Sequence, residues 1–233
     1  MGRSKTLYQV QQYDTQIDNA SKRIREIDAL LGDSKLLTDA LEIQSATEHV
    51  LIEKKKVLTS AEVVVGDHSL KIDQNQKKLY SGSVTNPKDL EDLQLESDSL
   101  NKYLLVLEER QIEAILEMDE AQNDFNNASS EAATIKLKME SEHTVLTAEK
   151  KDLEHSITKA TAQKDSFLSS NDILDLQTYL SLRKSSGGIA VTLMVSSSCS
   201  SCGANIPSAI AQEARSPVKL AFCPTCRRIL HPG

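Results

Sequence analysis

Four cysteines are the residues of this chain whose type and spacing most clearly indicate chemistry. They follow the pattern C-x2-C-x20-C-x2-C near the C-terminal end, and the sequence has no other cysteine. A C-x2-C turn presents two sulfurs to one ion, and two such knuckles complete a tetrahedral four-sulfur shell. The spacing therefore predicts one metal site formed by Cys199, Cys202, Cys223 and Cys226.

Zinc is the expected ion, with rubredoxin-like iron, disulfides and free thiols as the alternatives. Protein sulfurs would fill every coordination position, so the metal would be structural rather than catalytic. The segment 189–233 is too short to fold on an apolar core alone, so the ion is expected to substitute for that core. Gly203 follows the first knuckle, whereas Arg227 stands at the same place after the second.

Helices with a narrow apolar seam precede this segment. Apolar residues recur at steps of three and four from Val10 to Leu31, and again from Leu90 to Met139, as in a heptad seam. Ser97 and Gln111 are polar members of the second series and are interpreted as register or pairing devices, with unselected weak positions as the alternative. The period is disturbed at 32–34 and 63–68, where kinks or stutters are expected.

A reversal of the chain is predicted between the two series. Gly82 supplies a turn, while Asn86 and Pro87 suit the cap and the first position of a new helix. The predicted fold class is mainly α, a long antiparallel coiled-coil hairpin followed by a small C-terminal β zinc ribbon. A continuous helix in a parallel dimer is the alternative. Symmetric arms would place Val10 near Ile157 and Ile24 near His143.

Three segments follow from this pattern. The hairpin is expected over 1–170 with its tip near 81–87, a short helix and linker over 171–188, and the ribbon over 189–233. Ser170 or Asn171 is expected to cap the short helix, and Ser185–Gly188 to form a flexible joint. The β-branched content of 189–195 predicts a strand that leads into the first knuckle.

Charge is distributed unevenly along the chain. The net charge is −7, but 185–233 alone carries +3, because four basic residues there face only Glu213. Four thiolates around one Zn²⁺ would subtract two charges and leave this tail only mildly attractive to phosphate. Phe222 is expected to pack under its knuckle rather than to stack on a base. The residues available for contact with nucleic acid or another partner are Arg215, Lys219, Arg227 and Arg228.

Other kinds of site find little support in the sequence. The histidines of the long helices are interpreted as solvated or flanking residues, and His231 as a minor candidate ligand beside an already complete shell. There is no glycine-rich phosphate loop and no nucleophile beside a base, so neither an enzyme nor a small-molecule substrate is expected. The sequence has no apolar run of a membrane span and its N-terminus has no apolar signal region, which favours a cytoplasmic protein without membrane contact.

Three stretches together resemble a known bacterial family of C4-type zinc-ribbon proteins with an N-terminal helical hairpin. They are "LYSGSVTNPKDLEDLQLE", "YLSLRKSSGGIAVTLMV" and "CSSCGANIPSAI…FCPTCRRIL". The resemblance implies an elongated antiparallel coiled coil ending in a zinc ribbon, with the four cysteines as zinc ligands. Arg227 departs from the usual glycine of the family, and Gly203 from a frequent histidine or other polar residue.

For function, this resemblance implies two classes. Some members of the family are chaperones or adaptors for an alternative sigma factor and export components, one subset binds mRNA, and others are described as nucleic-acid-binding. We therefore expect a non-enzymatic adaptor or scaffold that acts on unidentified protein partners in regulation related to transcription or export. The alternative is an RNA- or DNA-binding protein acting through the basic ribbon. The acidic hairpin favours the adaptor because it repels phosphate.

Overall fold

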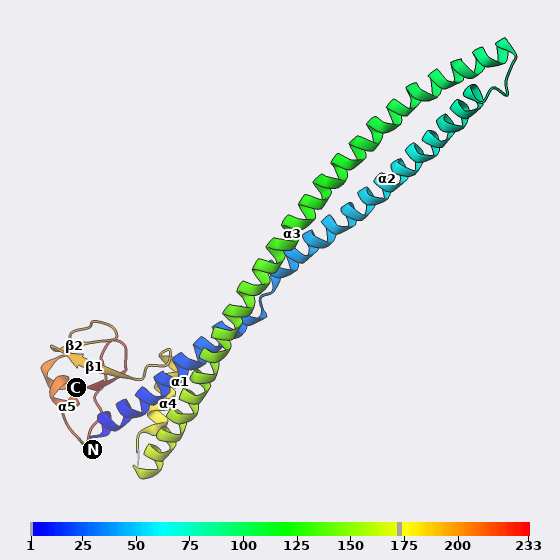
Figure 1. Cartoon of the computed structure of the whole chain (residues 1–233). Helices are drawn as coiled ribbons and strands as arrows, with labels where there is room; N and C mark the ends of the chain where they lie inside the picture. The colour runs from blue at the N-terminus through cyan, green and yellow to red at the C-terminus, as the bar shows by residue number, and fades with distance from the viewer. Residues whose placement is uncertain (1, 172–173) are drawn as a thin grey trace. The chain divides into compact units, whose positions relative to one another are not determined.

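The computed structural model describes residues 2–171 and 174–233. Its elements follow the order α1 (Arg3–Gly32), α2 (Lys35–Tyr80), α3 (Pro87–Ser170), α4 (Leu176–Ser185), β1 (Val191–Val195), β2 (Ser198–Cys199), α5 (Ser208–Ala214) and β3 (Ile229–His231) (Figure 1). Long helices followed by a small strand region confirm the predicted fold class. Among the described residues, none of the helices is both long and apolar enough to span a membrane.

The chain divides into two compact units. Met1–Asp33 and Glu142–Gly233 form one, called here the ribbon unit, and Ser34–Ser141 form the other, called the hairpin unit. The 84-residue helix α3 contributes to both. The break between α1 and α2 falls at Asp33 and Ser34, where the sequence predicted a disturbance. The second expected disturbance does not interrupt the helix, because α2 runs through Val63–His68.

In the hairpin unit, α2 and the first part of α3 lie side by side and antiparallel (Figure 1). The reversal occurs as predicted: Gly82 has a φ of +72°, and the Asn86 side chain accepts a hydrogen bond from the Lys88 N–H at 3.1 Å. Alanines recur on the buried side of α3, and such small residues let two helix backbones approach closely. They are Ala114, Ala121, Ala128 and Ala132.

The register of the two arms differs from the symmetric expectation. Asn75 of α2 donates to Glu96 of α3, whereas a turn centred between Tyr80 and Pro87 would pair Asn75 with residue 92. The shift is about one helical turn, and Figure 1 shows the start of α3 reaching further at the tip than the end of α2. The same offset persists in the ribbon unit, where Arg23 bonds Glu149 at 2.7 Å.

The proposed pairs Val10–Ile157 and Ile24–His143 are therefore wrong. Val10 instead belongs to a buried cluster against which Phe167 and Leu168 pack. The physical reason is that the two arms do not end level with one another at the tip. Because α3 begins beyond the last residues of α2, each residue of the first arm lies beside a later residue of α3 than a symmetric turn would give.

The ribbon unit contains the only sheet of the described residues, with strand order β2-β1-β3. β1 and β2 form an antiparallel hairpin in which Val195 pairs with Ser198. The two turn residues Ser196 and Ser197 both have positive φ, as a tight two-residue hairpin turn requires. β3 pairs with β1 in parallel, with Val191 opposite Ile229. This small sheet carries the cysteine segment.

The short helix α4 begins later than the sequence indicated. Asp175, rather than Ser170 or Asn171, precedes its first residue. Ser170 is instead the last residue of α3, and the Asn171 side chain donates back to the Phe167 carbonyl at 2.8 Å. Part of the predicted span, 172–173, lies outside the described residues. The joint after α4 contains Gly187 and Gly188, both with positive φ.

Candidate metal centre

The two knuckles have the same backbone geometry. In the first, the Gly203 N–H donates to the Cys199 carbonyl at 2.8 Å; in the second, the Arg227 N–H donates to the Cys223 carbonyl at 2.9 Å. The N–H groups of Cys199 and Cys223 are also engaged in matching ways, by the carbonyls of the residues that follow Gly203 and Arg227. Each C-x2-C sequence therefore closes into an equivalent turn.

This turn requires a left-handed backbone at the residue after its second cysteine. Gly203 adopts a φ of +72° there and Arg227 a φ of +59°. A side chain in that conformation costs about 1–2 kcal/mol, which glycine avoids. The departure at Arg227 noted in the sequence is thus a position of backbone strain in the second knuckle.

The four sulfurs converge on one point. All of them lie within 4.8 Å of one another, with Cys199 Sγ 3.8 Å from Cys226 Sγ and Cys202 Sγ 3.6 Å from Cys223 Sγ. A tetrahedral shell with metal–sulfur bonds of about 2.3 Å requires sulfur–sulfur distances of about 3.8 Å. The described residues contain no other such group of ligands. The geometry is compatible with a zinc ion held by these four residues alone.

The pKa values of the clustered cysteines also favour a bound cation. Burial raises the pKa of Cys199, but the Thr192 hydroxyl and the N–H groups of Cys202 and Ser201 outweigh it and lower the pKa to about 6. For Cys202, the Ala204 N–H lowers the pKa, whereas burial and hydrogen bonds shared with the other cysteines raise it to about 12. Four sulfurs this close cannot all become thiolates unless a cation lies among them.

Thr192 supports the cluster, and the sequence analysis did not single it out. It is almost fully buried in β1, its hydroxyl lies 3.6 Å from Cys199 Sγ, and it accepts a hydrogen bond from Ser201 at 2.9 Å. A buried hydroxyl beside a metal-binding sulfur orients the ligand. The available signal was a threonine inside the strand that leads to the first cysteine.

His231 does not belong to the cluster. Its Nδ1 lies 3.2 Å from the Ser4 hydroxyl, and its ring packs on Tyr8 of α1 with centroids 5.1 Å apart. Burial, and to a smaller extent the charge of Lys5, lowers its pKa. His231 therefore helps to attach β3 to α1.

Two buried polar side chains of α1 join this helix to β1 and to the helices α3 and α4. Gln11 is buried, and its side-chain amide donates to the Val191 carbonyl at 2.7 Å and accepts from the Ala190 and Val191 N–H groups. It therefore satisfies the backbone of β1 as a neighbouring strand would. Asp14 accepts from the Tyr179 hydroxyl and Lys164 at 2.7 Å each. Both residues were overlooked in the sequence because each directly follows a seam residue, Val10 or Tyr13, where a polar side chain is expected to face solvent.

The four predicted contact residues differ in whether their side chains are available to a partner. Arg215, Lys219 and Arg227 are exposed, but the Arg228 guanidinium donates to the carbonyls of Ile189 and Ser186 at 2.9 Å each. Arg228 therefore fixes the linker to the second knuckle. Its guanidinium is therefore used within the fold rather than available to a partner.

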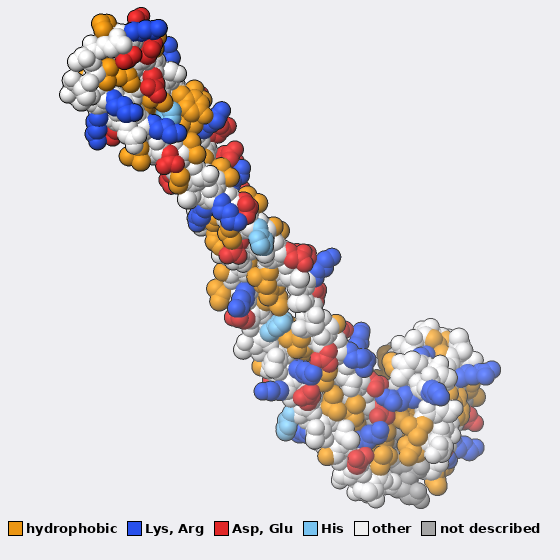
Figure 2. Space-filling view, turned by 90° about the vertical axis from the view of Figure 1, so that its right-hand side faces the viewer, with side chains coloured by type: hydrophobic (Ala, Val, Ile, Leu, Met, Phe, Trp, Pro, Cys, Tyr) orange, Lys and Arg blue, Asp and Glu red, His pale blue; other side chains and the backbone are white. Residues whose placement is uncertain are grey.

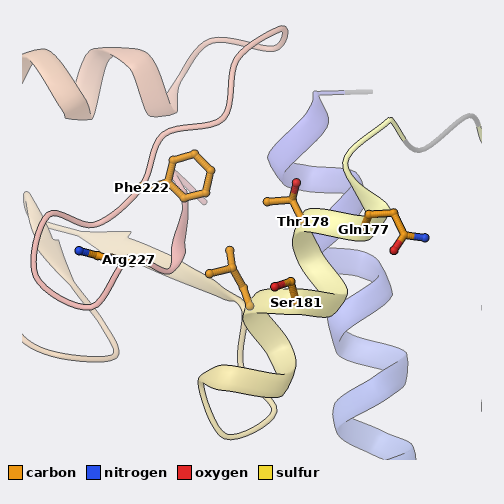
Figure 3. Close-up of a pocket in the computed structure, with 6 residues that line it drawn as sticks. Gln177, Thr178, Ser181, Phe222 and Arg227 are labelled. Atoms are coloured by element: carbon orange, nitrogen blue, oxygen red, sulfur yellow. The ribbon is translucent and has the colours of Figure 1, made fainter.

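Phe222 also differs from expectation. Its side chain is 41 % exposed rather than packed under the knuckle, since the adjacent Ala221 and Cys223 take the buried positions on either side of it. Phe222, Arg227 and residues of α4 line an open groove of about 660 Å³. Figure 3 shows Phe222 across from Thr178 and Ser181 of α4. Neither Arg215 nor Lys219 lines this groove.

The helical part of this chain matches a known protein family. The sequence pattern of the CT398-like coiled coil hairpin domain matches residues 10–187, more than half of the chain. This chain belongs to the CT398-like coiled-coil hairpin family. The matched range ends before the first cysteine, so the family assignment rests on the helices and the linker. No curated protein matches the sequence significantly.

Solved structures with a similar fold share little sequence with this family member. CT398 from Chlamydia trachomatis has a TM-score of 0.69 at 15 % identity, covering 99 % of this chain and 98 % of the other. A protein from Mycobacterium smegmatis has a TM-score of 0.63 at 16 % identity, covering 99 % of both chains. HP0958 from Helicobacter pylori has 16 % identity over 100 % and 99 % of the two chains, with a TM-score of 0.49. At such identities the likeness to CT398 and the Mycobacterium protein shows the fold alone.

Proposed function

We propose that this protein is a non-enzymatic adaptor that presents the helices of the hairpin unit to protein partners. The observation that carries this proposal is the exposure of large apolar side chains on the outer faces of α2 and α3. Apolar patches at the surface mark interaction sites when they are contiguous, and orange side chains are visible among charged ones in Figure 2. Such residues include Ile43, Val50, Val57 and Val64 on α2 and Leu95, Leu105, Ile112 and Leu116 on α3.

The cysteine cluster has a supporting role in this proposal. It holds one Zn²⁺ that folds the ribbon, and the four thiolates leave no coordination position for substrate or water. Elemental analysis after gentle purification should find about one zinc per chain. Iron in its place, or less than about half an equivalent of zinc, would contradict this assignment.

Photo-crosslinking in the native cell tests the adaptor function. A photoreactive amino acid at Val57 or Leu105 in the full chain should form adducts with specific proteins, because these side chains are exposed on the hairpin unit. The matched control places the same group at the exposed polar residue Ser99, on a different side of α3 from Leu105. The proposal fails if the two apolar positions capture no protein beyond those captured at Ser99.

Binding of nucleic acid is the second candidate, favoured by one observation. Exposed Phe222 and Arg227 line the same groove, and an aromatic ring beside a guanidinium can stack a base and contact a phosphate. With Arg228 committed to the linker, three exposed basic residues remain. Single-stranded RNA should then bind weakly, with a slope of log K against log salt of about −2.

One substitution separates this candidate from the adaptor. Arg227→Glu should abolish RNA retention while zinc content stays unchanged, since the side chain is not a ligand. Arg228→Glu is unsuitable because it would also release the linker carbonyls. No retention of RNA by the intact protein at low ionic strength would eliminate the nucleic-acid candidate.

A further inference from the structure

Three aliphatic side chains on α3 form a stripe that faces away from α2. Leu105, Ile112 and Leu116 are 66 %, 58 % and 64 % exposed. Their spacing of seven and four residues corresponds to two turns and one turn, so they lie on one face of the helix. The opposite face of the same turns carries buried Leu107 and Ala114. The stripe is therefore a second apolar seam, additional to the one inside the hairpin unit.

Carboxylates surround this seam on both sides. Glu109 lies within it, between Leu105 and Ile112, and all the acidic residues that flank it are exposed. Between residues 105 and 120, Arg110 is the only basic residue. Within the described part of the chain, Glu109 and Glu113 form no ion pair, whereas Glu117 is bound to Lys54 at 2.8 Å. The flanking acidic residues are Glu108, Glu113, Asp119 and Glu120.

The surface beside the stripe is hollowed. Val106, Ile112 and Leu116 line a shallow depression of about 390 Å³ together with Glu109, Arg110 and Glu113. Its aliphatic side chains suit apolar side chains of a partner, and its carboxylates suit ammonium or guanidinium groups of the same partner. A second copy of this chain is a poor occupant, because it would bring the same carboxylates against these.

We propose that Leu105, Ile112 and Leu116 form a docking seam for an amphipathic helix of a partner protein, with an aliphatic stripe flanked by Lys or Arg. The seam from Leu105 to Leu116 is about 17 Å long, so it accommodates roughly three to four turns of helix. A basic side chain of the partner faces Glu109. This inference rests on the proposed adaptor function and specifies the chemistry of its partner.

A pair of synthetic peptides provides the direct probe. Each peptide has three heptads, with Leu at the two seam positions of every heptad. One peptide carries Lys at the four positions of each heptad that flank the seam, and the other carries Glu at the same positions. The full-length protein should bind the Lys peptide at least about tenfold more tightly than the Glu peptide at moderate salt. Equal binding of both peptides, or binding of neither, would overturn the proposal.

Variants of the protein separate seam binding from general attraction between opposite charges. Leu105→Ser with Leu116→Ser keeps every carboxylate and should weaken Lys-peptide binding at least about tenfold. The matched control Leu137→Ser removes an equally exposed leucine, 68 % exposed, elsewhere on α3 and should leave binding unchanged. Circular dichroism verifies that each variant retains its helices. If the control loses as much affinity as the double variant, the seam is not the binding site.

Charge reversal gives a further test that a damaged fold could not imitate. Glu109→Lys with Glu113→Lys should remove the preference, so that both peptides bind with similar affinity, because the two lysines and Arg110 then balance Glu108, Asp119 and Glu120. Sedimentation equilibrium addresses self-association: a dimer that dissociates in the Leu105→Ser, Leu116→Ser variant would show that a second copy occupies the seam and would refute the proposal. If photo-crosslinking captures proteins but the Lys peptide does not bind, the adaptor function stands and this seam is rejected.

Discussion

The hairpin unit and the ribbon unit use α3 in different ways. In the hairpin unit, α3 packs on α2 through alanines repeated at Ala114, Ala121 and Ala128, so similar contacts recur every two turns. In the ribbon unit, single polar contacts that are not repeated join α1 to β1 and to α4, such as those of Gln11 and Asp14. Stability is therefore spread along the seam of the first unit and concentrated in a few side chains of the second.

Removal of the metal should produce the largest difference between the units. Chelation, or Cys223→Ser, leaves three or four unpaired thiols in a segment whose small buried cluster contains Cys199 and Cys223 themselves. Binding of a structural zinc contributes about 10 kcal/mol or more to the folding of such segments. Hydrogen exchange should show loss of amide protection in 190–231. The amides of Ser34–Ser141 serve as the internal control, and their simultaneous loss would show that the units are not independent.

Gln11→Ala should destabilise the ribbon unit by about 2–4 kcal/mol. The substitution leaves the buried Ala190 N–H, Val191 N–H and Val191 carbonyl without their partner, and each unpaired buried group costs about 1–3 kcal/mol, less what water recovers. Denaturant unfolding monitored at residues 190–231 measures the effect. Gln12→Ala, at an exposed neighbouring position, is the control and should change stability by less than about 0.5 kcal/mol.

Ala132→Leu should destabilise the hairpin unit by about 1–3 kcal/mol, because the larger side chain overfills a seam where Ala132 is 3 % exposed. Thermal unfolding followed by circular dichroism reports the loss. Ala133→Leu places the same side chain on the exposed side of the same turn and should be nearly neutral. Similar destabilisation by both variants would mean that the alanine repeat does not set the helix spacing.

Arg227→Gly should have the smallest effect, and it should be stabilising. Glycine relieves the left-handed strain at a φ of +59°. It also raises the entropy of the unfolded chain, which offsets part of this gain, so a net stabilisation of about 0.5–1 kcal/mol is expected. The concentration of chelator needed to extract half of the metal should rise. Arg215→Gly, at a residue with a φ of −78°, should not raise it; an equal rise there would exclude backbone strain as the cause.

Periodic features of the hairpin unit could be predicted from the sequence. The heptad spacing, the turn at Gly82 and the cap at Asn86 are local signals, and each appears in the structure where the sequence placed it. The sulfur cluster was equally accessible, because the two C-x2-C spacings restrict its geometry. The register was not accessible: it depends on where α3 begins relative to the end of α2, which no local pattern specifies.

The attachment of β1 and α4 to α1 could not be predicted either. Gln11 and Asp14 are polar residues in a coiled-coil sequence, and only the positions of Val191 and Tyr179, far along the chain, give them partners. For the same reason, the start of α4 at Leu176 and the exposure of Phe222 were predicted incorrectly. Contacts between residues more than 160 positions apart leave no periodic trace in the sequence.

The distance along the chain between these partners affects how the protein folds during synthesis. Ser4, Gln11 and Asp14 are made early, but the residues that satisfy them, from Tyr179 to His231, are made near the end. At about 5–20 residues per second, roughly 10 s or more separate the two. The hairpin unit can close on the ribosome in that interval, because both of its arms are complete. Until then the polar side chains of the N-terminal turns of α1 remain hydrated, so the attachment of β1, β3 and α4 to α1 forms last.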